Sequence, residues 1–265
     1  VVLAAGALDT PAVLLRSGIG GPAAGDYLRL HPATAVAGFY DEPQKGWWGP
    51  PQSGLSTTFA DVEDGYGYLI ETSHASPGVS GAAFPWQGAE AHKEIMASSP
   101  VTAAFVFLIR DHGHGRVTID AAGNPVHSYA FNDPLDRRVF AHGLEEMVRL
   151  HEAAGANGVA TFHRTLEPWR RDSGVPIEDY IAQVREASLE PYEHATFSLH
   201  HMGSARMGTD PQASAANPWG ELHDTPGVWI GDASGFPTAS GTNPMLTTMA
   251  MALRTAEAIA AGRGA

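Results

Sequence analysis

Val228-Trp229-Ile230-Gly231-Asp232-Ala233-Ser234 decides the fold, because a short apolar strand here runs into a tight turn that carries an acidic side chain. A buried strand that ends in such a turn is typical of α/β proteins. Asn243-Pro244 then predicts the start of a long helix, since asparagine is a good N-cap and proline fits the first helical position. The apolar residues of this helix fall on one side: Leu246, Met249, Leu253, Ala256 and Ala260.

The start of the chain has the same texture. A strand over residues 1–5 runs into a glycine turn, and Thr10-Pro11 predicts a short helix that ends at Ser17-Gly18. Because the two ends are alike, we expect segments 1–24 and 192–265 to form one α/β domain, with the middle of the chain inserted into it.

The inserted segment, residues 25–191, predicts a largely antiparallel sheet backed by helices. Segments rich in β-branched and aromatic residues predict strands, with turns at 113–115 and 122–124 as the expected hairpin connections. These segments are 34–40, 66–72, 101–110 and 116–120.

Two helices are expected in the same segment. One begins at Asp133-Pro134 and ends near Gly155, and the other begins at Pro176. Phe140, Leu144, Met147 and Val148 share one face of the first. Residues 49–54 and 75–88 are expected to form surface loops.

Composition excludes several classes of function. Acidic residues outnumber basic ones, 29 to 16, so nucleic acid is an unfavourable partner. The chain has no cysteine, which rules out thiolate metal sites and cysteine nucleophiles and leaves redox chemistry to a cofactor. Apolar runs are too short for a membrane span, so we expect a soluble, cytoplasmic protein. Since the chain opens on a strand without an initiator methionine, we expect it to begin inside a domain.

His200 is the candidate general base in the segment His200-His201-Met202-Gly203-Ser204. Alcohol oxidation by a flavin needs a base for the hydroxyl proton, and the ordinary pKa of histidine suits that task. The alternative is a structural histidine. A metal site made by His194, His200 and His201 is also conceivable, but adjacent histidines of an extended chain point to opposite faces, and we expect no metal.

The helix start at Asn243, Pro244 and Met245 is a candidate flavin contact. Amides at a helix N-terminus stabilise negative charge, which a reduced flavin carries along its N1 and C2 carbonyl edge. Asp232, at the end of a strand, is a candidate for binding a ribityl or ribose hydroxyl. The alternatives are an ordinary capped helix and a turn aspartate that binds its own backbone.

Taken together, these segments resemble the glucose-methanol-choline (GMC) oxidoreductases, FAD enzymes that oxidise alcohols. Residues 6–20 fit the second signature of that family at every constrained position, and residues 203–208 fit its Gly-(Ser/Thr)-x-Arg-Met-Gly segment. The segments 28–32, 198–203 and 237–244 look most like bacterial relatives of the long-chain alcohol oxidases.

The resemblance implies roles for individual residues. His200 would be the catalytic base, and Asn243, 43 residues later, would hold the substrate oxygen. Asp232 and Ala233 match the strand-end FAD contact, and the backbone of Asn243, Pro244 and Met245 matches the helix end beneath the flavin. Segments 1–24 and 192–265 would belong to a Rossmann-like FAD domain, and 25–191 would form the substrate domain.

The resemblance covers the C-terminal half of a family member, since no Gly-x-Gly-x-x-Gly motif occurs in this chain. We therefore expect an FAD-dependent alcohol oxidase or dehydrogenase in which this chain alone is inactive, with oxygen or another electron acceptor. The alternative is a truncated product or interaction module without catalytic activity.

Overall fold

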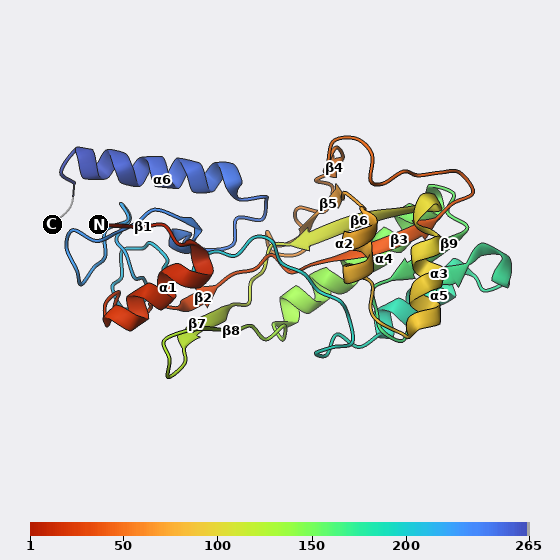
Figure 1. The fold of residues 1–265 in the computed structure, drawn as a ribbon, viewed down its shortest axis with the longest axis horizontal. Coiled ribbons are helices and arrows are strands. Elements are labelled where there is room, and N and C mark those ends of the chain that lie inside the picture. The colour runs from red at the N-terminus through yellow and green to blue at the C-terminus, as the bar shows by residue number, and fades with distance from the viewer. Residues whose placement is uncertain (264–265) are drawn as a thin grey trace. The chain divides into compact units, whose positions relative to one another are not determined.

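The computed structural model describes residues 1–263, which divide into two compact units (Figure 1). Unit 1 consists of Val1–His31, Arg110–Asp133 and Ser198–Ala265, and unit 2 of Pro32–Ile109 and Pro134–Phe197. Both ends of the chain thus lie in unit 1, together with Arg110–Asp133 from the middle of the chain.

Unit 2 is built on a six-stranded sheet with the order β10-β9-β3-β6-β5-β4. Every neighbouring pair is antiparallel, as the sequence predicted. The central pair, β3 and β6, is in register from Ala33 opposite Leu108 to Phe39 opposite Thr102. The strands are β3 (Ala33–Phe39), β4 (Leu55–Ser56), β5 (Tyr68–Thr72), β6 (Thr102–Ile109), β9 (Gly158–Thr161) and β10 (Trp169–Arg170).

Helix α4 (Pro134–Ala153) covers this sheet by contacting β3, β6 and β9. Its predicted apolar face is confirmed, since Phe140, Leu144, Met147 and Val148 are buried. Gly155, with φ of 86°, follows the helix as expected. Helix α5 (Ile177–Glu186) packs on α4 and buries Tyr180, Ile181 and Val184.

The remaining elements of unit 2 are short. The segment expected to be a loop over 75–88 contains a helix, α2 (Pro77–Ala83), which begins where Pro77 occupies the first helical position. The others are α3 (Ala89–Ala97) and the 3-10 turns η1 (Ser99–Val101) and η2 (Arg171–Ser173).

Unit 1 contains a two-stranded parallel sheet that joins the two ends of the chain. β1 (Val2–Leu3) pairs with β11 (Trp229–Ile230), which confirms both expected strands. Helix α1 (Gly6–Ser17) follows β1 and contacts η3 (Ala233–Gly235). It begins at Gly6, four residues before the helix start predicted at Thr10-Pro11. Thr10 lies inside the helix, and its hydroxyl donates to Asp232 and does not cap the helix.

A three-stranded sheet, β2-β7-β8, completes the β structure of unit 1. Its strands are β2 (Asp26–Leu28), β7 (Gly115–Ile119) and β8 (Pro125–Ser128). The turn at 122–124 joins β7 and β8 as predicted. The predicted hairpin at 113–115 is wrong, because β7 pairs with β2 and not with the strand that precedes it in sequence.

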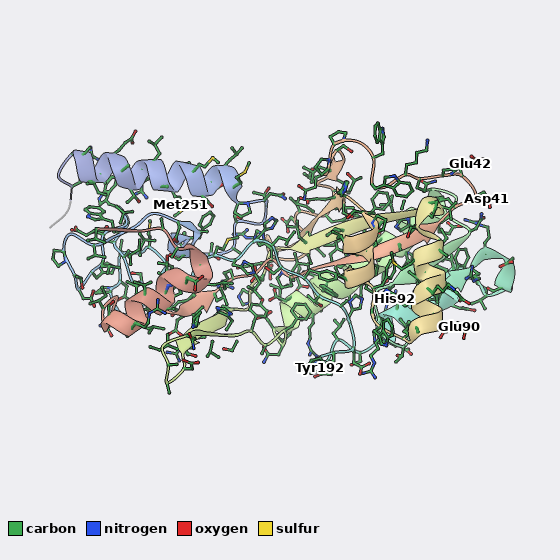
Figure 2. All side chains as sticks on the ribbon, viewed as in Figure 1. Asp41, Glu42, Glu90, His92, Tyr192 and Met251 are labelled. Carbon is green, nitrogen blue, oxygen red and sulfur yellow. The ribbon has the colours of Figure 1, made fainter. Side chains whose placement is uncertain are left out.

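The core of unit 1 lies among α1, η3, β11 and the irregular segment that follows Gly203. It includes Leu14, Ala205, Met207, Leu222 and Ile230. Helix α6 (Met245–Ala260) contributes Met251, whose side chain Figure 2 shows on the inner side of the helix. The expected apolar face of α6 is exposed instead: Leu246, Met249 and Leu253 are 72%, 59% and 61% exposed.

No helix within residues 1–263 combines the length and the apolar character needed to cross a membrane.

Candidate functional site

All six predicted site residues lie in unit 1. They come from an extended segment around His200, from the turn after β11, and from the start of α6. The sequence separates these segments, and the fold of unit 1 groups them.

His200 is positioned by an antiparallel contact between two irregular segments. The backbone groups of Arg29 and Met202 exchange hydrogen bonds of 2.8 and 3.0 Å, and the Ser198 hydroxyl donates to the Leu30 carbonyl. Gly203 follows with φ of 82°, where a Cβ atom would lie 2.8 Å from the Tyr27 carbonyl oxygen. This close approach explains why glycine is needed after the histidine segment.

The paired segments bring His200 against His31. Their Nδ1 atoms are 3.3 Å apart, and the two rings meet edge to face with centroids 5.4 Å apart. The other nitrogen of His31, Nε2, accepts a hydrogen bond of 3.0 Å from the Gly241 amide. His31 therefore contacts both His200 and the turn that leads to Asn243, two residues after Gly241.

Burial keeps both histidines neutral near pH 7. It is the main reason that the pKa of His200 lies below its ordinary value of 6.5, and the neighbouring His201 lowers that pKa further. Burial also lowers the pKa of His31 to about 3, with smaller contributions from His200 and Arg110. A neutral imidazole at His200 can accept a proton, as a general base must.

Asp111 fixes the loop that carries His31. Its buried carboxylate accepts hydrogen bonds from the backbone amides of Leu30 and His31, at 2.9 and 3.2 Å, and from the Tyr129 hydroxyl at 3.2 Å. Burial raises the pKa of this carboxyl. His31 has φ of 48°, a left-handed conformation that non-glycine residues seldom adopt, and these bonds hold it there.

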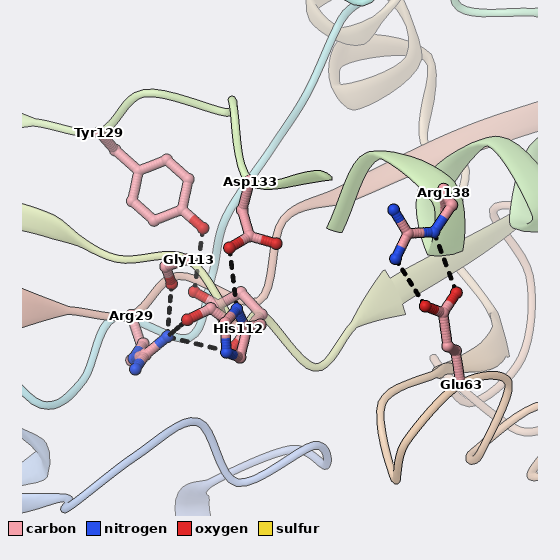
Figure 3. A network of polar contacts seen from close by, with 8 residues as sticks. Arg29, Glu63, His112, Gly113, Tyr129, Asp133 and Arg138 are labelled. Carbon is pink, nitrogen blue, oxygen red and sulfur yellow. Dashed lines mark hydrogen bonds and ion pairs between the residues drawn. The ribbon is translucent and has the colours of Figure 1, made fainter. Parts of the chain in front are cut away.

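Arg29 supports the same loop from the other side. Its guanidinium donates to the carbonyl oxygens of Asp111, His112 and Gly113, while His112 contacts Asp133 at 2.8 Å (Figure 3). Figure 3 also shows the separate pair of Arg138 and Glu63 within unit 2.

Sequence reasoning missed His31 and Asp111. The segment 28–32 contributed to the family resemblance, but the sequence analysis assigned no functional role to His31 within it. His31 lies 169 residues before His200, and the contact depends on a pairing that no local pattern predicts. The one usable signal was a histidine directly before Pro32 in a segment that matched the family.

Asp232 is engaged in structural hydrogen bonds. One carboxylate oxygen accepts from the Gly6 amide at 2.9 Å and from the Thr10 hydroxyl at 2.5 Å, and the other accepts from the Ser234 amide at 2.8 Å. The carboxylate thus ties the start of α1 to η3. The bond to Ser234 is the turn contact considered as the alternative to cofactor binding.

Ala233 begins η3, and its carbonyl oxygen accepts from the Gly203 amide at 3.0 Å. This bond joins the strand-end turn to the histidine segment, so Asp232 and Ala233 lie close in space to the residues that follow His200.

Helix α6 begins at Met245, with Pro244 in the cap position and Asn243, which is partly buried, just before it. The predicted cap is therefore displaced by one residue. The Pro244 carbonyl accepts from the amide and the hydroxyl of Thr248, at 2.7 and 2.8 Å. The first turn of α6 contains no acidic residue, and the side chain of its N-cap residue, Pro244, makes no capping hydrogen bond, so its amide end can favour an anion.

Within residues 1–263, no group of three or more histidine, cysteine, aspartate or glutamate side chains lies close enough together to hold a metal ion. His194 of the conceivable trio lies in unit 2 and contacts the Thr34 hydroxyl.

Several known proteins are similar to this chain in sequence. A family model described as GMC oxidoreductase matches residues 111–252, which include His200, Asp232 and Asn243. A long-chain-alcohol oxidase of Arabidopsis thaliana is 33% identical over 95% of this chain and 35% of its own length. An uncharacterized GMC-type oxidoreductase of Mycobacterium tuberculosis is 35% identical over 97% of this chain and 39% of its own length.

Solved structures share the fold. A pyridoxine 4-oxidase described as from Mesorbium loti has a TM-score of 0.65 at 20% identity and covers 97% of this chain and 50% of its own. A formate oxidase of Aspergillus oryzae, in a study of FAD modification, has a TM-score of 0.66 at 14% identity and covers 98% and 54%. The expected mixed α/β flavoprotein fold is thereby confirmed.

Two points about the resemblance follow. The long-chain-alcohol oxidases among these relatives come from a plant, and the Mycobacterium tuberculosis relative is described as uncharacterized. The chain also spans little more than a third of the length of these relatives.

Proposed function

This chain belongs to the GMC oxidoreductase family, and we propose that it forms part of an FAD-dependent enzyme that oxidises the CH–OH group of an alcohol. FAD is the cofactor of this family, and it supplies the hydride acceptor when bound. The observation that carries the proposal is the contact of neutral His200 with His31. His31 also accepts a hydrogen bond from the amide of Gly241, two residues before Asn243.

The residues of unit 1 fit a flavin. The first turn of α6 offers amides without an acidic neighbour, which suits the electron-rich edge of the ring. We assign the backbone of Asn243, Pro244 and Met245 to that edge. Asp232 and Ala233, at the end of β11, are assigned to the hydroxyls of the ribityl or ribose group.

His200 is the proposed general base. Its pKa is lowered by burial, so the ring is neutral at pH 7 and takes the hydroxyl proton as the carbon loses a hydride. The Asn243 carboxamide is proposed to donate to the substrate oxygen and hold the alcohol in line for that transfer.

The wider setting belongs to the same proposal. The substrate is a small-molecule alcohol, the final electron acceptor is oxygen or another oxidant, and the protein works in the cytoplasm. Because the chain spans little more than a third of its relatives' length, we propose that it is inactive alone.

A chimaera tests this function. Residues 1–263 would replace the matching region of the Mycobacterium tuberculosis relative, and the purified protein would be examined for a bound-flavin spectrum. Anaerobic addition of primary alcohols of increasing chain length is expected to bleach that spectrum. A chimaera that binds no flavin, or whose flavin no alcohol reduces, would favour the reading as a module without catalytic activity.

A further inference from the structure

The contact between His31 and His200 assigns a proton to each ring. A neutral imidazole carries one N–H and one acceptor nitrogen. The Gly241 amide can only donate, so Nε2 of His31, 3.0 Å away, must be the acceptor. The proton of His31 therefore sits on Nδ1.

The same reasoning then passes to the second ring. Nδ1 of His31 is 3.3 Å from Nδ1 of His200, and because the first carries a proton, the second must accept it. The proton of neutral His200 is consequently on Nε2. The opposite arrangement would place the Gly241 N–H against a second N–H on His31.

His31 is held in the orientation that this assignment needs. It is 1% exposed, its backbone amide donates to Asp111, and Gly241 itself is packed against the Arg110 side chain. Arg110 in turn donates to the Ala239 carbonyl at 3.3 Å, which steadies the turn that supplies the amide. Of the charged groups around the pair, Asp111 thus holds the backbone of His31, and Arg110 lies beside the turn that supplies the Gly241 amide.

We propose that His31 is a positioning residue that fixes the resting tautomer of His200, with the proton on Nε2. Its consequence for catalysis rests on the proposed function. His200 first meets an alcohol as a hydrogen-bond donor through Nε2. It acts as a base at that atom only after Nε2 releases its proton to solvent and Nδ1 takes one up from solvent, so that the ring stays neutral and the bond to His31 opens.

The direct test is ¹⁵N NMR of the histidine side chains in the unmodified chain, near pH 7. Long-range correlation spectra distinguish protonated from unprotonated ring nitrogens. We expect opposite tautomers in the two rings, Nδ1–H in His31 and Nε2–H in His200, with a scalar coupling across the Nδ1–Nδ1 hydrogen bond. A proton on Nδ1 of His200, or on Nε2 of His31, would overturn the assignment.

Variants extend the test. His31→Leu is expected to remove the coupling and to allow a population of Nδ1-protonated His200, whereas His31→Gln, which keeps a donor and an acceptor, should restore the Nε2–H form in part. His201→Gln is the matched control, because His201 makes no bond to either ring nitrogen of His31, and it should leave the tautomer of His200 as in the unmodified chain. An unchanged tautomer population in His31→Leu would contradict the positioning role.

These spectra need neither flavin nor turnover. If the chimaera fails to oxidise alcohols, the tautomer assignment is unaffected. If the spectra show the other tautomer, the proposed alcohol oxidation is still tested by the chimaera.

Discussion

A single half-buried imidazole carries most of the chemistry proposed for this protein. The protonation state of His200 is set by its surroundings. Burial lowers its pKa, and Nδ1 of His31 contacts Nδ1 of its ring. Asp232 differs, because its three hydrogen bonds all go to groups of unit 1 and stabilise the fold.

The lowered pKa of His200 predicts a pH dependence. A base must be unprotonated, so alcohol oxidation by the flavin-loaded chimaera should be lost as pH falls through the pKa of His200. Because burial places that pKa below 6.5, activity should persist at pH values where an exposed histidine is already charged. The measurement is flavin reduction rate against pH, and an acidic limb centred above 6.5 would contradict it.

Removing the Asp232 carboxylate should destabilise unit 1. Asp232→Ala leaves the Gly6 amide, the Thr10 hydroxyl and the Ser234 amide without their acceptor. Unsatisfied buried donors cost about 1–3 kcal/mol, which urea unfolding would detect. Asp210→Ala, at an exposed turn with one such bond, is the control and should cost less. An equal loss of unfolding free energy in both variants would show that the Asp232 carboxylate does not stabilise unit 1 more than an exposed turn carboxylate does.

At the scale of elements, local sequence patterns predicted individual helices and strands better than they predicted which strands pair. The burial of Phe140 and Leu144 on α4 followed from helical periodicity, and the strands of the large sheet followed from their β-branched residues. The hairpin at 113–115 was wrong because two glycines predict a turn but not which strands it joins. The start of α1 was missed because Thr10 binds Asp232, a residue 222 positions away.

The junction of α4 with β3 gives a sharp test at this scale. His151 of α4 donates from Nε2 to the Val36 carbonyl and accepts from the Tyr40 hydroxyl, both at 2.9 Å. A Cβ atom on Gly38 would lie 2.3 Å from Nδ1 of this ring. Gly38→Ala must therefore displace His151 and should lower the free energy of unfolding by about 1–3 kcal/mol.

Gly78→Ala is the matched control for this substitution. Gly78 lies in α2, where an added Cβ meets no atom within 4 Å, and alanine is the better helix former by about 1 kcal/mol. Its unfolding free energy should be unchanged or higher. If both variants unfold at the same urea concentration, the close packing of His151 on β3 is refuted.

At the scale of the whole molecule, family and cofactor could be read from the sequence, while the supporting residues of the site could not. Motifs of fixed spacing, such as residues 203–208, identify the family without any knowledge of packing. The grouping of residues 110–133 with both chain ends, and with it the placement of Asp111 beneath His31, depends on contacts between distant segments.

The chimaera with a single substitution, His200→Ala, tests the central claim most directly, by the rate at which an alcohol reduces its bound flavin under anaerobic conditions. We predict that this rate falls by about 10²–10⁴-fold, the usual contribution of a general base, while the flavin stays bound and the His201→Gln control reduces at the parental rate. A His200→Ala protein that binds flavin and reduces it at the parental rate would contradict the account.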